Sequence, residues 1–517
     1  MPEYLSPGVY IEEVNTGPRP IEGVGTAMAA FVGFAPGGPI NRPTLISNWT
    51  QYVETFGAAD ESGRPNPHMP DAFLSHAVYG YFLNGGGRCY VTSVAATNGK
   101  QERPAEVQIP SRSSKAVPSL TIAPKGTPTS DIQIEVAPPS GEGAGDGTFT
   151  VRVRQGDGEP EVFENVSLGK RGGKNVVETI NQASRLITIA EAQSTGPIAE
   201  RAPEVGSYTL KAAPPAPIAQ IQPAHMVGAA ADRSGLEGLE VAEDVTMVCC
   251  PDLVSRAVLG AIGREGVKAV QLAMIAHCER MGDRMAILDP LPAAAPQEVR
   301  RWREQEAGYD SKFAALYYPW ISVAGPDGQP MAVPPCGHIA GIYARNDNER
   351  GVHKAPANEV IRGALDSVMA ITKGEQDTLN PIGVNCIRAF SGRGLRVWGA
   401  RTLSSDPAWR YVNVRRLFNY VEKSIERGTQ WVVFEPNDPD LWARVRRDVG
   451  AFLTGVWRNG MLFGRSPEEA FYVKCDAELN PPDVRDRGQL VVEIGLAPVK
   501  PAEFVIFRFS QFAGGGA

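Results

Sequence analysis

A run of apolar, strand-forming residues near the C-terminal end constrains this sequence most. Residues 504–509 read FVIFRF, so a strand formed by them would carry apolar side chains on both of its faces. Such a strand is an aggregation site unless another strand pairs with it or another element covers it. The sequence therefore predicts a partner for this segment.

The N-terminal end has the same property. Residues 6–8, Ser-Pro-Gly, are typical of a turn, and residues 9–11 are β-prone without a strand-forming run nearby to pair with them. We predict extended arms at residues 1–20 and 501–517. The candidate strand residues of these arms are Val9, Tyr10, Ile11, Glu12, Phe504, Val505, Ile506, Phe507, Arg508 and Phe509.

Strand and helix patterns alternate between the two arms. Residues 71–84 carry an apolar stripe at helical spacing, three glycines end it, and a buried-type strand follows at residues 89–94. The same alternation resumes from residue 245, which indicates an α/β fold. Further stripes predict helices at residues 360–369, 406–428 and 438–459, and apolar runs predict strands at residues 431–435, 470–475, 490–496 and 503–510.

Residues 97–224 have a different sequence pattern from the rest of the chain: short stretches of alternating apolar and polar residues, typical of strands, are separated by Gly, Pro and Asp turns. We predict a discontinuous α/β (α+β) core of mixed sheet and helices with an inserted β-rich domain. The predicted parts are a first core segment at 21–96, an inserted outer domain at 97–235 with a Pro/Ala linker at 211–223, a middle α/β segment at 236–379 and a C-terminal domain at 380–500.

Composition supports a folded protein. Hydrophobic residues make up 43% of the 517 residues and charged residues 21%, so the chain can bury a core. Seven cysteines without a CxxC motif indicate reduced, buried thiols. We find no signal peptide and no apolar stretch of membrane-spanning length, so we expect assembly in the cytoplasm and release by another route, such as lysis.

Charge is divided unevenly along the chain. Residues 380–517 contain 19 Lys and Arg against 15 Asp and Glu, whereas residues 1–379 contain 32 against 43. Arginines are dense over residues 388–447, and arginine favours bidentate pairing with carboxylates. A protein partner is thus favoured over nucleic acid, since the net charge of the chain is −7. The alternative, which stays open, is that solvent-exposed faces of the two parts simply differ in charge and bind no charged partner.

Signatures of catalysis are missing from the sequence. It contains no P-loop, no HExxH and no GxSxG motif, and its six histidines never stand at metal-ligand spacing. His338 and His353 border a polar stretch at residues 344–350, which could form an acid/base site; a solvated or interface loop is the favoured interpretation. We therefore predict no catalytic, cofactor-binding or metal-binding residue, and no enzyme activity.

Several motifs, in a fixed order, resemble contractile tail sheath proteins of phages and of phage-tail-like injection systems. They span both ends and the middle of the chain, whereas residues 97–235 are unfamiliar. The motifs are YLSPGVYIEE (4–13), FVGFA (31–35), GHIAGIYAR (337–345), GVHKAPAN (351–358), RVWGARTLS (396–404), WRYVNVRRL (409–417), WVVFEPN (431–437), AFYVKCD (470–476) and APVKPAEFV (497–505).

This resemblance implies a structural subunit. Family members polymerise as helical homo-oligomers of stacked rings around an inner tube, and contract to drive the tube through a target envelope. It also implies that terminal arms add strands to the sheets of neighbouring subunits. Implied partners are the tube, baseplate and terminator or cap proteins, with no direct nucleic acid contact and no membrane insertion. The basic C-terminal part would face the tube, with Arg444, Arg446 and Arg447 as candidate contacts.

Alternatives remain at this point. A virion tail sheath for DNA delivery and an injection-system sheath share these motifs, and both are assembled in the bacterial cytoplasm and released as particles after lysis. A capsid or baseplate protein would lack paired terminal strands. A soluble α/β enzyme would need a convergent polar site that the sequence does not reveal.

Overall fold

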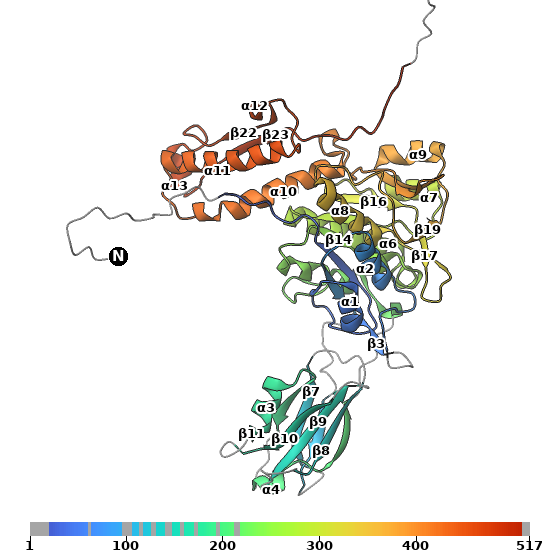
Figure 1. The fold of residues 1–517 in the computed structure, drawn as a ribbon, viewed down its shortest axis with the longest axis vertical. Helices are drawn as coiled ribbons and strands as arrows, with labels where there is room; N and C mark the ends of the chain where they lie inside the picture. Colours follow the sequence, from blue (N-terminus) through green and yellow to red (C-terminus); the bar gives the residue numbers. More distant parts are fainter. Residues whose placement is uncertain are drawn as a thin grey trace, which may run out of the picture. The chain divides into compact units, whose positions relative to one another are not determined.

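The computed structural model describes residues 20–59, 64–95, 106–112, 117–125, 131–139, 147–155, 160–169, 174–192, 197–210 and 218–508 (Figure 1). Two compact units divide the chain. The smaller unit contains residues 1–25 and 417–517, and the larger one contains residues 26–416. The predicted domain limits stay a prediction.

An eight-stranded mixed sheet forms the centre of the larger unit. Its inner strands are parallel, and one antiparallel strand closes each edge. The strand order is β2 (Thr44–Ile46), β5 (Cys89–Ser93), β1 (Ala29–Gly33), β14 (Met247–Cys249), β15 (Met285–Leu288), β16 (Ala314–Tyr318), β20 (Val384–Phe390) and β21 (Gly394–Val397). The predicted α/β fold with a mixed sheet is confirmed.

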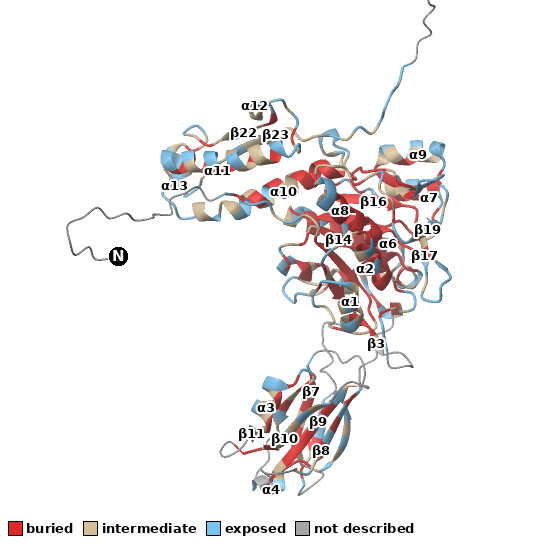
Figure 2. Ribbon diagram, in the orientation of Figure 1, coloured by how far each residue is buried: buried red, intermediate tan, exposed pale blue. Residues whose placement is uncertain are grey.

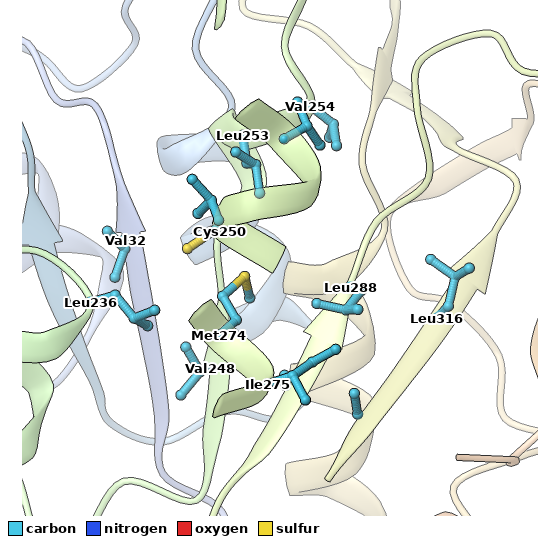
Figure 3. Close-up of a cluster of buried hydrophobic side chains, with 14 of the residues drawn as sticks. Val32, Leu236, Val248, Cys250, Leu253, Val254, Met274, Ile275, Leu288 and Leu316 are labelled. Carbon is cyan, nitrogen blue, oxygen red and sulfur yellow. The ribbon is translucent and has the colours of Figure 1, made fainter. Parts of the chain in front are cut away.

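Both faces of this sheet are buried, as expected for strands with helical connections. Val248 and Leu288 face one apolar cluster together with Met274 of α6 (Arg256–Met281) (Figure 3). Met247 and Ile287, one residue along each strand, face a second cluster. Other helices of this unit are α1 (Trp49–Phe56), α2 (Leu74–Leu83), α5 (Pro223–Val227), α7 (Pro296–Arg301), α8 (Cys336–Arg350) and α9 (Lys373–Leu379).

Two short sheets also belong to the larger unit. A three-stranded sheet has the order β18 (Pro330–Val333), β17 (Ile321–Ala324), β19 (Ala364–Ser367), and a two-stranded one pairs β3 (Ala58–Ala59) with β4 (Pro65–Asn66). Strand β19 overturns the predicted helix at residues 360–369. Gly363 has a φ of 82°, outside the helical region, and β19 pairs with β17 instead.

Residues 107–210 form a β-rich part with its own apolar cluster. Strand side chains alternate there: Ile132 and Ile134 are buried, whereas Gln133 and Glu135 are exposed. One sheet has the order β11 (Lys174–Asn175), β10 (Glu161–Ser167), β9 (Thr148–Gln155), β8 (Ile132–Ala137), β13 (Gly206–Leu210). The other has the order β12 (Ile187–Glu191), β7 (Pro118–Pro124), β6 (Val107–Pro110), with helices α3 (Val176–Ala183) and α4 (Ile198–Arg201) nearby in the sequence.

The smaller unit is built on two long helices. α10 (Val412–Gly428) begins in the larger unit and continues into the smaller one, and α11 (Pro439–Arg458) follows it. The unit also contains α12 (Pro467–Ala470), β22 (Phe471–Lys474), α13 (Pro482–Asp486) and β23 (Glu493–Leu496).

The predicted strand at residues 431–435 is wrong. Gln430–Val432 is a 3₁₀ turn, and Phe434 has a φ of 69°. The backbone bonds to itself there, because Glu435 N donates to Val432 O at 3.1 Å. Among the described strands, none pairs with this segment, so local hydrogen bonds prevail over β propensity.

Candidate assembly site

The apolar C-terminal segment is exposed. Phe504, Val505, Ile506 and Phe507 expose 70, 68, 78 and 77% of their surface, and residues 501–508 form neither helix nor strand (Figure 2). The predicted strand at 503–510 is therefore absent over 503–508 in the single chain. A strand needs a partner to bond its backbone groups, and no such partner strand occurs among the described residues.

Residues upstream of this segment are anchored. Phe463 N donates to Ala497 O at 2.8 Å, and Leu462 forms a bridge with Pro498. The chain is therefore held up to residue 498 and presents its apolar segment shortly afterwards. The other predicted arm residues, Val9, Tyr10, Ile11, Glu12 and Phe509, lie outside the described residues.

A small sheet in the same unit offers free edges. β22 and β23 pair antiparallel, with Phe471 opposite Leu496 and Lys474 opposite Glu493. Within the described chain no third strand joins them. Their outer backbone groups can therefore accept an added strand.

The three predicted tube-contacting arginines lie on α11. Its N-cap, Asp438, accepts a hydrogen bond from Leu441 N at 2.8 Å, and the apolar face of the helix is buried. Arg446 and Arg447 are exposed, whereas Arg444 is half-buried. The helix thus presents basic side chains on its polar face.

Each of these arginines already has an intramolecular partner. Arg444 Nη2 lies 3.1 Å from Glu435 Oε2, Arg446 donates to Cys475 O, and Arg447 Nε lies 2.9 Å from Asp448 Oδ1. The Arg447 side chain is 55% exposed. The Arg444–Glu435 pair, with side chains 42% and 38% exposed, contributes roughly 0–1 kcal/mol and can exchange partners at low cost. The Asp448 side chain is only 4% exposed, so Arg447 would leave a buried carboxylate unpaired if it changed partner.

Arg416 belongs to the arginine-rich region but lies inside the larger unit. Its guanidinium forms a bidentate pair with Asp347 at 2.9 and 2.6 Å, and both side chains are 3% exposed. Thr26 completes the site: its Oγ1 donates to Asp347 Oδ2 at 2.6 Å, and its carbonyl accepts from Arg416 Nη2 at 2.9 Å. The sequence predicted arginine–carboxylate pairing at interfaces, and it did not reveal this internal pair.

The polar segment between His338 and His353, considered as an acid/base site, is helical over most of its length. Residues 344–350, predicted as a polar loop, form the second half of α8, so the loop interpretation is wrong. His338 is buried in the first turn of α8, against Gly80 of α2. Burial, together with the smaller effect of the neighbouring His76, lowers the pKa of His338 to about 4.

Carboxylates occupy the edge of the central sheet where open α/β folds bind ligands. Asp252, just after β14, is fully buried and accepts hydrogen bonds from the backbone N–H groups of Phe34 at 2.5 Å, of Leu74 at 3.1 Å and of Phe73. Burial raises the pKa of Asp252 to about 7, and these three N–H groups oppose that shift. Asp289, just after β15, accepts from Cys336 N at 2.9 Å. Both carboxylates are thus bound to the protein's own backbone.

Two negative findings concern the described residues alone. None of their helices is both long and apolar enough to span a membrane. No cluster of three or more His, Cys, Asp or Glu side chains among them could bind a metal ion. All seven cysteines are free and buried.

Comparison with known proteins places the chain in a family. Residues 243–403 match the phage tail sheath protein central domain, and residues 404–512 match the phage tail sheath C-terminal domain. The chain belongs to the phage tail sheath protein family, as the motifs predicted. A relative, the tail sheath protein of Vibrio phage KVP40, is 30% identical over 181 residues, which are 34% of this chain and 26% of that protein.

Solved structures agree along the whole chain. The helical sheath of the anti-feeding prophage in its contracted state is 25% identical, with a TM-score of 0.59, over 98% of this chain and 99% of that one. A chain in the baseplate structure of the same particle is 25% identical, with a TM-score of 0.56, over 99% and 100%. Three curated tail sheath relatives are longer, and the chain spans 26, 28 and 40% of their length.

Proposed function

We propose that this chain is the structural subunit of a contractile sheath, which polymerises helically around an inner tube and contracts to drive the tube through a target envelope. The single observation that carries the proposal, beside family membership, is the exposed apolar segment at Phe504–Phe507 in a unit whose small sheet has free edges. The apolar segment of one copy can add as a strand to the free sheet edge of another copy.

Strand exchange would be head to tail. An arm of one subunit pairs with the sheet of the next, so the contact is heterologous and generates an open helical array. The candidate arm residues are those predicted at 9–12 and 504–509. Backbone pairing would keep the array continuous while rigid subunit bodies move between two states.

Truncation of the C-terminal arm tests this exchange. A chain ending at residue 502 should stay unassembled where the intact chain forms tubes, because it lacks the apolar strand. A chain ending at residue 512 keeps that strand and serves as the matched control. Electron microscopy and sedimentation distinguish the two, and ordered tubes from the chain ending at 502 would contradict the exchange.

The tube contact is a separate part of the proposal. Arg444, Arg446 and Arg447 would bind carboxylates of the tube protein in the extended state, since they lie on the polar face of α11 and arginine pairs well with carboxylates. Replacing all three by Glu should abolish extended, tube-filled particles while contracted sheaths still assemble. Extended particles at the wild-type yield, counted by electron microscopy, would contradict this contact.

Further partners follow from the same proposal. The likeness to a chain in a baseplate structure supports association with a baseplate, and tube and terminator or cap proteins complete the set. Assembly in the bacterial cytoplasm and release as a virion or extracellular particle fit this role. The role is structural and not enzymatic; sheaths of phage tails and of injection systems satisfy it equally.

A further inference from the structure

One face of α10 contacts the chain just after the N-terminal arm. Arg416, Tyr420, Ser424 and Gly428 follow one another at four-residue spacing, so their side chains lie along a single face of the helix. Residues 21–26 of the same chain supply the contacts to this face. We call these four residues of α10 the seat.

Residues 21–26 run antiparallel to the seat: lower residue numbers in this segment contact higher residue numbers in α10. Val24 N donates to Ser424 Oγ at 3.1 Å. Gly23 lies so close to Tyr420 that a Cβ on Gly23 would overlap the Tyr420 ring, and a Cβ on Gly428 would lie 2.7 Å from Ile21. At the beginning of the stripe Arg416 donates to Thr26 O. Ile21, the first residue after the predicted arm, therefore lies against Gly428, the last residue of α10.

Two features hold the seat in place. Ser424 Oγ donates to Tyr420 O at 2.6 Å while it accepts from Val24 N, so its one proton is already committed within α10. Arg416 is bound to Asp347, which fixes the beginning of α10 inside the larger unit.

We propose that Tyr420, Ser424 and Gly428 are positioning residues that set the point and direction at which the N-terminal arm leaves the subunit. A strand can join a neighbour's sheet only if its root points toward that sheet within the reach of the arm. Fixing the root lowers the entropy that the arm loses on pairing. The inference rests on the proposed strand exchange and adds the element that directs it.

Gly23 and Gly25 provide a matched pair for the test. Val at position 23 must displace Tyr420, whereas Gly25 has open space within 4 Å of a Cβ. The same substitution at both positions changes the unfolded chain equally, so the difference reports the native contact. Gly23→Val should leave the melting temperature within a few degrees of Gly25→Val, raise hydrogen exchange at Val24 N at least tenfold, and raise the concentration needed for tube formation at least tenfold.

Assembly of Gly23→Val at the same concentration as Gly25→Val would overturn the proposal, whether or not Val24 N is deprotected. If Gly23→Val does not fold, Ser424→Ala removes the hydroxyl that accepts from Val24 N and donates to Tyr420 O, and it should still raise the assembly concentration a few-fold. A chain lacking residues 1–13 distinguishes failure of the proposed strand exchange from failure of the role proposed for the seat. If that chain assembles normally, the strand exchange itself is contradicted. If that chain fails to assemble while Gly23→Val forms normal tubes, only the role of the seat is contradicted.

Discussion

Replacing Asp347 by Asn should lower the free energy of unfolding of the larger unit by about 3–5 kcal/mol, because it leaves the Arg416 guanidinium buried without its counter-charge. Burial alone would lower the pKa of Arg416, and the charge and hydrogen bonds of Asp347 reverse that effect. Asn keeps the shape of Asp, so the loss reports charge rather than packing. Urea unfolding monitored by circular dichroism measures it.

Two further variants test this account of Asp347. Glu349→Gln removes a carboxylate from the exposed side of the same helix and should change the unfolding free energy by less than about 0.5 kcal/mol. The double variant Asp347→Leu/Arg416→Leu removes both charges and should be more stable than Asp347→Asn. If Asp347→Asn lowers the free energy of unfolding by less than about 1 kcal/mol, the conclusion that buried Arg416 depends on the charge of Asp347 is contradicted.

Deleting residues 1–13 should abolish ordered polymers without unfolding the subunit. The deletion removes the β-prone residues Val9, Tyr10, Ile11 and Glu12 and none of the residues 20–508 that carry the described contacts. Because each subunit would lose one of its strand exchanges, the effect on assembly is expected to be all or none. Sedimentation and electron microscopy measure it, and the melting temperature shows that the fold persists.

Removal of residues 1–3 alone is the control for this truncation, since the strand-forming residues remain. That chain should assemble as the intact one does. Tubes that form and contract normally without residues 1–13 would refute the role of the N-terminal arm and leave the C-terminal arm as the sole exchange.

Periodicity in the sequence predicted the core well, because burial on both faces of a parallel sheet and on one face of a helix imposes regular apolar spacing. The helix predicted at residues 438–459 corresponds to α11, whose N-cap is Asp438. The helix predicted at residues 406–428 begins later than expected: Asp406 caps a 3₁₀ turn at Pro407–Trp409, and α10 begins at Val412. The predictions for two short elements were wrong because contacts outside the local sequence pattern determine their structure. Residues 360–369 include a strand that pairs with β17, and residues 431–435 form a turn before a proline.

Side-chain partners distant in the sequence were beyond prediction. Arg416 looks like any other arginine of its basic region, but its partner Asp347 stands 69 residues earlier. Similarly, nothing in the spacing of Gly23 shows that Tyr420 lies against it. The terminal segments were easier to interpret, because an apolar strand without a local partner implies a partner elsewhere.

Electron microscopy of the purified intact chain tests the central claim most directly. A sheath subunit should form long, hollow tubes with helical ridges at micromolar concentration, since its contacts are heterologous and do not close. A preparation that contains only monomers or closed, globular oligomers would contradict the account.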